Sequence, residues 1–371
     1  MTRFKHRQCG LTMIELMVAM GLGLTVLLAA CTLLIGTTRA HAALVASSEM
    51  DDSGRYAMDA LARAVRMAAH VDWERTPVLD TAAPARIGGV DAASLSRTGF
   101  GIDEHLPDAV NGSDVLALRF PGSGNAPDGD GATLDCAGFP KHRDEEGWSI
   151  FYVARNAQGK AELRCKYRGN ANWSSDAVAS NVDGFQVLYG LDTDDDGVPN
   201  RYVRALELAA LDAGLLLTSS APGEREAELR LRTHWKRVVT VRAALLLHGP
   251  RLEPGLGEAI VHDLFGPDHA AALSGSDPGT RLSEAQLRGT EGARLRKVYG
   301  VTVALPAMPA APPFSATPPT VPPGPPPDPP SDPPPGPPPD PSSGPLPGPP
   351  PDPQPASASL VWSYASPPLC A

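Results

Sequence analysis

One apolar segment near the start of the chain constrains its fold more than any other feature. Residues 11–35 contain a single charged side chain, Glu15, in 25 positions. As an α-helix the segment would be about 37 Å long, which exceeds the roughly 30 Å hydrocarbon core of a bilayer. Residues 1–10 carry three lysine or arginine side chains and no acidic one, so the positive-inside tendency keeps this end in the cytoplasm. The sequence therefore predicts a single-pass membrane helix with an exported body.

Two other kinds of exported chain match parts of this segment. A cleaved secretory signal peptide also has a basic start, but its apolar core spans only about 7–15 residues. Residues 28–31 (LAAC) match the small-residue pattern before a lipid-modified cysteine, yet the apolar run continues past Cys31, where a lipoprotein turns polar. A chemically inert cysteine in an apolar helix is the commoner case. We therefore expect a retained helix that contains Cys31.

The carboxylate of Glu15 is the unusual group in this helix, because inserting it into hydrocarbon costs about 2.5–3.5 kcal/mol and a paired cation would offset that cost. A basic leader that ends in Gly10, followed by LTMIE at residues 11–15, resembles the type IV prepilin leader. The resemblance implies that a membrane peptidase cuts after Gly10 and methylates the new amino terminus, Leu11. It also implies that Glu15 pairs with the terminal amine of a neighbouring subunit. Leu11 replaces the commoner phenylalanine, and no proline lies near Thr32, where major pilins often have one.

The helical pattern continues through residues 39–69 and predicts that the helix packs on a globular head. Apolar residues recur at three- and four-residue steps, and charged residues occupy the rest of the helical wheel. The apolar stripe is Met58, Leu61, Val65 and Ala68, and the charged residues are Asp59, Arg63 and Arg66.

Alternating segments in the rest of the body predict β-strands. They are residues 114–120, 147–154, 161–167, 185–189, 238–247 and 298–305. Residues 156–159 (NAQG) suit a hairpin turn between the second and third of these strands. Because no helical segments alternate with them, the sheet should be antiparallel, and residues 250–290 should form loops or short helices. The predicted fold class is α+β and pilin-like, with a long N-terminal helix on an antiparallel sheet.

Residues 54–68 resemble the PilW type of minor pilin. Further segments fit the same family, namely residues 113–120, 182–190, 235–247 and 294–305. The resemblance implies a structural protein that takes part in type IV pilus assembly, in a priming or tip complex. It implies as partners other minor and major pilins, the prepilin peptidase and methylase, the inner membrane and a pilus-tip adhesin. The head would lie in the periplasm and later in the pilus or at the cell surface.

Two alternatives remain open at the level of sequence. A type II secretion pseudopilin shares the leader and the helix. From another class, a membrane-anchored exported adhesin or calcium-binding module would never enter a fibre.

The last part of the chain is dominated by proline. Of 41 prolines, 29 lie in residues 306–371. Such a composition cannot bury enough apolar surface to fold, so it predicts an extended polyproline II tail at about 3.1 Å per residue. The tail is a spacer, or it docks to a partner near its aromatic cluster at residues 361–364 (VWSY).

The predicted organisation has five parts. They are the leader at 1–10, the transmembrane and assembly helix at 11–36, its amphipathic continuation at 37–70, the β-rich periplasmic head at 71–305, and the tail at 306–371.

Several function classes are excluded by composition and motifs. A net charge of −10 without a basic patch argues against binding nucleic acid. The chain has no GxxxxGK[ST], no HExxH, and no GxGxxG between a strand and a helix, and its nine histidines lack orienting neighbours in the sequence. We therefore predict no catalytic residues, no enzyme and no required cofactor.

Two cysteines of the exported head are expected to form a disulfide. Cys136 and Cys165 flank the first strand of the hairpin, no CxxC metal spacing exists, and an exported compartment permits oxidation. Cys370, near the end of the chain, is either unpaired or attached to another molecule.

An acidic loop is the candidate metal site. Asp192, Asp194 and Asp196, followed by Gly197, reproduce the start of a calcium loop, and Asn200 could add an oxygen. The twelfth position is Val203 instead of a bidentate glutamate. The alternative interpretation is a solvated Asp/Gly turn between two strands.

Overall fold

The computed structural model describes residues 12–69, 83–169, 172–251, 260–273, 275–288 and 293–305. The predicted leader, Leu11, Cys370 and the proline-rich tail lie outside these residues.

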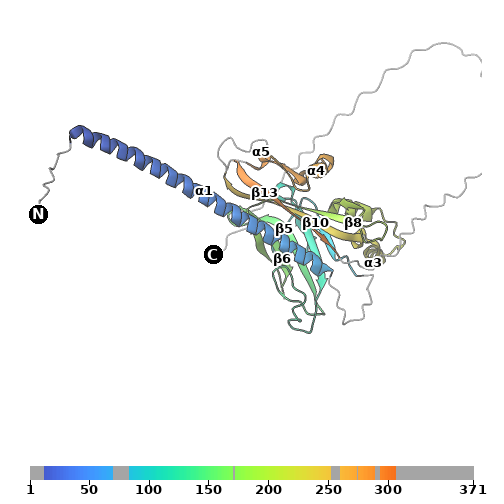
Figure 1. The fold of residues 1–371 in the computed structure, drawn as a ribbon. Coiled ribbons are helices and arrows are strands. Elements are labelled where there is room, and N and C mark those ends of the chain that lie inside the picture. The colour runs from blue at the N-terminus through green and yellow to red at the C-terminus, as the bar shows by residue number, and fades with distance from the viewer. Residues whose placement is uncertain are drawn as a thin grey trace, which may run out of the picture. The chain divides into compact units, whose positions relative to one another are not determined.

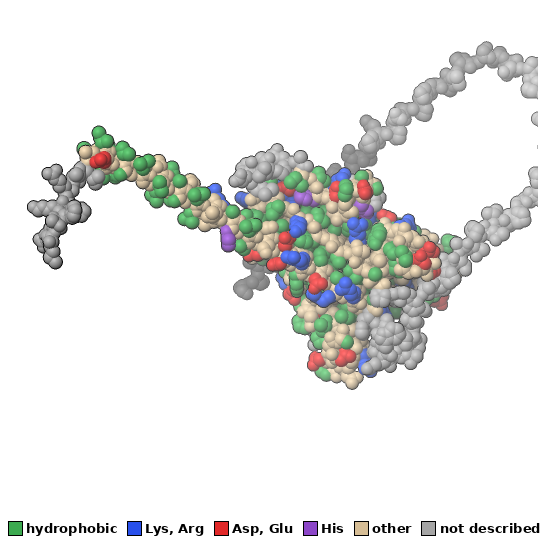
Figure 2. Space-filling view, viewed as in Figure 1, with side chains coloured by type: hydrophobic (Ala, Val, Ile, Leu, Met, Phe, Trp, Pro, Cys, Tyr) green, Lys and Arg blue, Asp and Glu red, His purple; other side chains and the backbone are tan. Residues whose placement is uncertain are grey.

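The described chain begins with a single uninterrupted helix of 56 residues, α1 (Met13–Ala68). Thr12 caps its start, and the helix runs without a break through Thr32, where the chain has no proline. The first half is long and apolar enough to cross a bilayer. Hydrophobic side chains lie along this half in Figure 2, and none of the described residues 12–49 is buried.

The second half of α1 packs on the head (Figure 1). The predicted stripe of Met58, Leu61, Val65 and Ala68 is buried, whereas Asp59, Arg63 and Arg66 are exposed. The helical periodicity of this segment is therefore confirmed.

The strands of the head form two antiparallel sheets. The first has the order β1 (Ile87–Val90), β4 (Val115–Pro121), β5 (Glu146–Arg155), β6 (Ala161–Arg168) and β7 (Trp173–Ser180). The second has the order β13 (Arg294–Ala304), β10 (Val238–Arg251), β8 (Val182–Leu191) and β9 (Arg201–Val203). Two short pairs complete the described strands, β2 (Ser94–Leu95) with β3 (His105–Leu106) and β11 (Val261–Asp263) with β12 (Arg281–Ser283). All six predicted strands are present.

The head also contains helices that the strand pattern did not predict. They are α2 (Ala205–Ala213) and α3 (Pro222–Arg232), with α4 (Pro267–Leu273) and α5 (Glu284–Leu287) in the region expected to hold loops or short helices. Three single turns of 3₁₀ helix lie at Val110–Gly112, His234–Arg237 and Pro278–Thr280. No residue of α3 is buried. An exposed helix needs no apolar stripe, so the sequence pattern did not predict this one.

The main core lies where α1 meets both sheets. The helix contacts β4 and β7 of the first sheet and β10 and β13 of the second. Leu61 and Val65 of α1 share this core with Leu116, Phe151 and Leu245 of the sheets, all of them fully buried. The membrane helix is therefore continuous with a structural element of the head.

A buried ionic network attaches the segment that holds β11, β12 and α5 to the second sheet. Arg296 of β13 donates from Nε to Asp183 Oδ2 at 2.6 Å and also bonds Glu284, and the Arg296 and Glu284 side chains are each only 2% exposed. His248 contacts Asp183 at 3.0 Å, and His262 lies 3.5 Å from Glu284. Each buried charge in the network thus has a partner of opposite sign.

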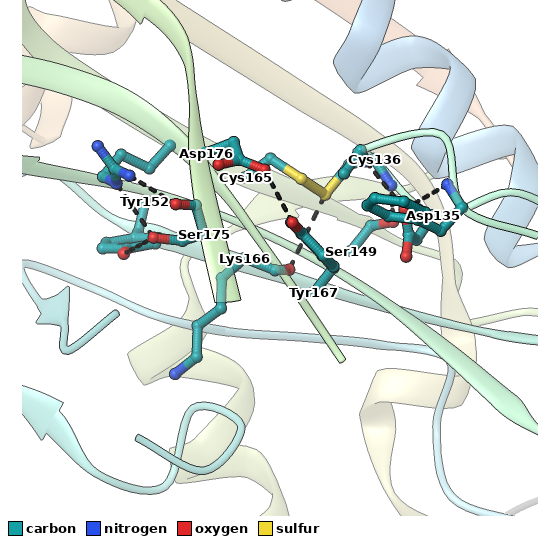
Figure 3. Close-up of a disulfide and its surroundings, with 12 residues drawn as sticks. Asp135, Cys136, Ser149, Tyr152, Cys165, Lys166, Tyr167, Ser175 and Asp176 are labelled. Atoms are coloured by element: carbon teal, nitrogen blue, oxygen red, sulfur yellow. Dashed lines mark hydrogen bonds between the residues drawn. A yellow bond between two sulfur atoms is a disulfide. The ribbon is translucent and has the colours of Figure 1, made fainter. Parts of the chain in front are cut away.

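A disulfide joins Cys136 to Cys165, as predicted (Figure 3). Cys165 belongs to β6, and Cys136 lies in the loop between β4 and β5, where its N–H donates to Ser149 Oγ at 2.9 Å. The bond therefore fastens a long loop to the middle of the first sheet.

Replacing both cysteines with serine should lower the free energy of unfolding by about 3–4 kcal/mol, because the bridge closes a chain segment with a sequence separation of 29 residues. Urea denaturation with and without a reductant measures the loss. Cys31→Ser, which removes the exposed cysteine of α1, is the control and should leave the value unchanged. Equal stability of the double serine variant and the natural chain would contradict the prediction.

Candidate functional site

The start of α1 holds the carboxylate that the sequence singled out. Glu15 Oε2 accepts hydrogen bonds from Thr12 N at 2.9 Å and from Thr12 Oγ1 at 3.0 Å, and Glu15 N donates back to Thr12 Oγ1. This capping box satisfies orphan donors of the first turn and places a negative charge at the positive end of the helix dipole. The predicted cleavage and methylation positions, Gly10 and Leu11, lie outside the described residues and stay predictions.

The rest of the membrane half of α1 presents a surface that is apolar all round. Its large exposed hydrophobic residues are Met13, Ile14, Leu16, Met17, Val18, Met20, Leu22, Leu24, Val26, Leu27, Leu28, Leu33, Leu34 and Ile35. The threonine hydroxyls donate to carbonyls one turn back, for example Thr25 to Leu22 at 2.8 Å and Thr32 to Ala29 at 2.9 Å. These hydroxyl groups are therefore satisfied within the helix. Glu15 is the one charged residue between Thr12 and Ile35.

A three-residue junction fixes α1 to the outer strand of the second sheet. Asp51 accepts hydrogen bonds from Lys297 Nζ at 2.6 Å and from the Tyr299 hydroxyl, and these bonds lower the pKa of the Asp51 carboxyl below its usual value. The Tyr299 ring lies against the helix at Gly54, where a Cβ would come within 2.6 Å of it. The absence of a side chain at position 54 permits this close approach of the Tyr299 ring to α1.

Sequence reasoning did not find this junction. Asp51 and Tyr299 are 248 positions apart, and the one local signal was the lone Gly54 inside an otherwise helical segment.

The predicted calcium ligands do converge. One carboxylate oxygen from each of Asp192, Asp194 and Asp196 lies within 4.8 Å of the others. Asn200 joins the same loop, and its Nδ2 donates to Asp194 Oδ1 at 3.1 Å. Val203, at the twelfth position, is a buried residue of β9.

The same loop is also stabilised by its own backbone, as an Asp/Gly turn would be. Asp192 accepts N–H donors from Asp195 at 2.7 Å and Gly197 at 2.8 Å. Although burial opposes the shift, these bonds keep the pKa of Asp192 below its usual value. Arg237 binds both carboxylate oxygens of Asp195. The geometry accommodates both interpretations, and calcium binding stays a prediction.

Millimolar calcium should raise the Tm by roughly 3–5 °C, the shift expected when the free ion is about tenfold above its Kd. Thermal melting across a calcium titration measures this shift. Replacing Asp194 and Asp196 together with asparagine should abolish the response, whereas Asp128→Asn, an exposed acidic residue of another loop, should retain it. A Tm that does not move with calcium would exclude the site.

The head contains a second set of carboxylates that was not predicted. Asp91 accepts the N–H groups of Ala205 at 3.0 Å and Leu206 at 2.9 Å and thereby caps α2. Asp114 is fully buried, which raises its pKa well above the usual value. Burial raises the pKa of Asp277 to about 6, against the opposing charge of Arg204.

Asp277→Asn should make the chain more stable at pH 8 by up to about 3 kcal/mol, the free energy that corresponds to raising the pKa of Asp277 from 3.8 to about 6. In the natural chain the folded pKa of Asp277 is raised, so its penalty is absent below about pH 4, grows as the pH rises towards 6, and is complete above that. Denaturation at pH 4 and pH 8 tests the sign. A stability difference between the variant and the natural chain that is independent of pH would contradict it.

Comparison with known proteins agrees with these features. Residues 5–30 match the prokaryotic N-terminal methylation motif, and residues 150–307, from β5 to the end of β13, match the family of type IV pilus-assembly protein W. A type IV-like pilin from Thermus thermophilus is similar at 15% identity with a TM-score of 0.28, over 69% of this chain and 96% of that chain. No curated protein matches the chain.

The start of α1 is thus consistent with membrane anchoring and export to the pilus, and the family match indicates a structural protein instead of an enzyme. Residues 150–307 of this chain therefore belong to the PilW family of type IV pilus-assembly proteins, and residues 5–30 carry the prokaryotic N-terminal methylation motif.

Proposed function

We propose that this chain is a minor pilin that joins the priming or tip complex of a type IV pilus through α1, after cleavage at Gly10 and methylation of Leu11. The observation that carries the proposal is the pattern of polar groups on the membrane half of α1. The surface is apolar all round, its described hydroxyls are satisfied, and a single carboxylate stands at the first turn.

A surface of this kind fits both of the environments that a pilin meets. In the inner membrane it faces lipid, and in a fibre it faces the apolar helices of other pilins. The transfer from one to the other needs a partner for Glu15, because a carboxylate buried among apolar helices is stable only beside a cation. Cleavage after Gly10 would supply that cation as a new terminal amine on each subunit. The proposed partners are therefore other pilins and the prepilin peptidase.

The junction at Asp51 supports the same proposal. If the helix positions the subunit in a fibre, the head must be attached to the helix. The hydrogen bonds of Lys297 and Tyr299 with Asp51 of α1 make this attachment. An independent exported module on a membrane anchor would need no such coupling.

Mass spectrometry of the mature amino terminus tests the proposal most directly. We expect a chain that begins at Leu11 and carries one added methyl group. Gly10→Val, which blocks the cleavage position, is the control and should retain the full leader. Any other mature terminus would overturn the proposal.

Loss of the gene separates a pilus from a secretion system, since a pseudopilin shares the leader and the helix. We expect surface pili to disappear while the secretion of folded enzymes continues. The reverse result would assign the chain to the secretion machinery.

A further inference from the structure

β13 presents an unpaired edge to the outside of the second sheet. It is the terminal strand of the order β13-β10-β8-β9, and no described strand pairs with its outer side (Figure 1). At eleven residues it is also long for an edge strand. Exposed edges of this length template the addition of a further strand, and proteins normally protect them.

The register of the sheet identifies the backbone groups that face outward. Leu305 N donates to Val239 O at 2.8 Å, directly opposite in the β10–β13 register, so these two form a hydrogen-bonded pair. In antiparallel pairing such pairs alternate with residues whose N–H and C=O point away from the partner. Val298, Gly300 and Thr302 therefore present their backbone groups to the open side.

The Arg294 end of this edge is covered, and the other end is open. Arg294 N donates to Glu284 Oε1 at 3.1 Å, so α5 caps the first outward position. Beyond it, Tyr299, Gly300 and Val301 line an open groove whose opposite wall is α1.

The α1 wall of this groove suits an aromatic strand. Tyr56 is 58% exposed beside Met58 and Ala62, so an aromatic ring has an apolar surface on which to pack. The rim carries Arg55 and Arg66 together with Asp59, so its positive charges outnumber its negative one.

Gly300 has no side chain that would cover the edge. The packing of the head would allow a larger residue at this position. A Cβ at this position would meet only Ala243 O, at an ordinary 3.6 Å. Glycine in a strand often marks a place where another backbone approaches closely.

The sequence contains a segment with the properties of the missing strand. Residues 356–366 (ASASLVWSYAS) are the longest proline-free stretch after residue 305, and their eleven residues equal the length of β13. Leu360, Trp362 and Tyr364 alternate with smaller residues, which is the pattern of a half-exposed strand. The tail around them has four aspartates and no lysine or arginine, a charge opposite in sign to the small net positive charge of the rim.

The spacer before this segment suits donation to another subunit. Fifty residues separate Leu305 from Ala356, and a polyproline II spacer of that length would reach about 155 Å. A strand returning to its own neighbour normally needs a loop of 2–5 residues, and a long stiff spacer gives a low effective concentration at its own head. Copies held in one membrane are instead concentrated beside one another.

We propose that the outer edge of β13, residues 298–304, accepts residues 356–366 of a second copy as an added β-strand. Reciprocal donation closes the pair with two-fold symmetry and leaves neither edge open. The proposal does not depend on processing at Gly10, so an unmethylated amino terminus would leave it standing.

Proline substitutions test the edge in the full-length protein in detergent, with oligomeric state read by analytical ultracentrifugation. Thr302→Pro removes an outward N–H without breaking a bond to β10, and Trp362→Pro removes the strand capacity of the donor. We expect a dimer for the natural chain and monomers for both variants, with Ser342→Pro, in the spacer, remaining dimeric. A monomeric natural chain, or a dimer that Trp362→Pro leaves intact, would overturn the proposal.

Mixed cross-linking then identifies the occupant. One preparation carries Thr302→Cys and the other Ser363→Cys, both with Cys31 and Cys370 replaced by serine, and a short bis-maleimide joins them. We expect a covalent heterodimer at least tenfold more abundant than with Ser342→Cys as donor. Equal yields from the two donors would overturn the proposal, as would a chain carrying both cysteines that gives only an intrachain product.

Discussion

Glu15→Ala should leave cleavage after Gly10 intact and reduce incorporation into pili at least tenfold. Alanine removes a charge whose insertion costs about 2.5–3.5 kcal/mol, so the variant should enter the membrane at least as well as the natural chain. It should nevertheless fail in the fibre, because the carboxylate is the one charged group on the described apolar surface of α1 that could pair with a neighbour's amine. Mass spectrometry of the amino terminus and immunoblots of sheared surface fractions measure the two effects separately.

A matched control is available on the same helix. Glu49 is an exposed carboxylate of α1 outside the apolar span, so Glu49→Ala changes the same chemical group without changing the assembly surface. It should support normal piliation. An exported adhesin or calcium module that acts outside a fibre would keep its activity with Glu15→Ala, and that outcome would refute the assembly role.

Arg296→Leu should lower the free energy of unfolding by about 3–5 kcal/mol, the usual cost of leaving buried charges without their partner. The substitution removes the one arginine that binds both Asp183 and Glu284, and its side chain is only 2% exposed. Urea denaturation of the disulfide-bonded protein measures the loss. Arg281→Leu is the control, because Arg281 is 39% exposed in its pair with Asp263 and should cost less than about 1 kcal/mol.

The pH dependence of this loss has a definite sign. Although burial acts to raise them, His248 and Arg296 hold the pKa of Asp183 below its usual value, and Arg296 does the same for the pKa of Glu284. In the natural chain these groups contribute stability above about pH 4, which is lost as the pH falls through their folded pKa values. In the variant both carboxylates become easier to protonate, so the difference between the two chains should be largest at neutral pH. A loss that grows towards acid pH would argue against the network.

The sequence predicted those helices and strands in which apolar residues recur at regular intervals. The helix was expected through residue 69 and ends at Ala68, because its stripe is continuous. Strand β8 begins before the predicted 185–189, because Val182 and Gly184 pair with β10 although the alternation is interrupted at Asp183 and Gly184. Strand β7 was missed because its sequence, WSSDAVAS, is composed mainly of small and polar residues.

Residues of the candidate site could be predicted from the sequence only where they lie close together in the chain. Glu15 stands out against its neighbours, and the three aspartates of the acidic loop are spaced as ligands. The junction of Asp51 with Lys297 and the network of Asp183 with Arg296 join residues more than a hundred positions apart. Such pairs are created by the topology of the second sheet and leave no local pattern.

The contact of Tyr299 with Gly54 has a mechanical consequence. Tension on the head of an anchored subunit must pass into the membrane helix, and this turn of α1 is bonded to a strand whose other side is hydrogen-bonded to β10 along its length. A force applied at this contact would be distributed over the backbone hydrogen bonds between β13 and β10.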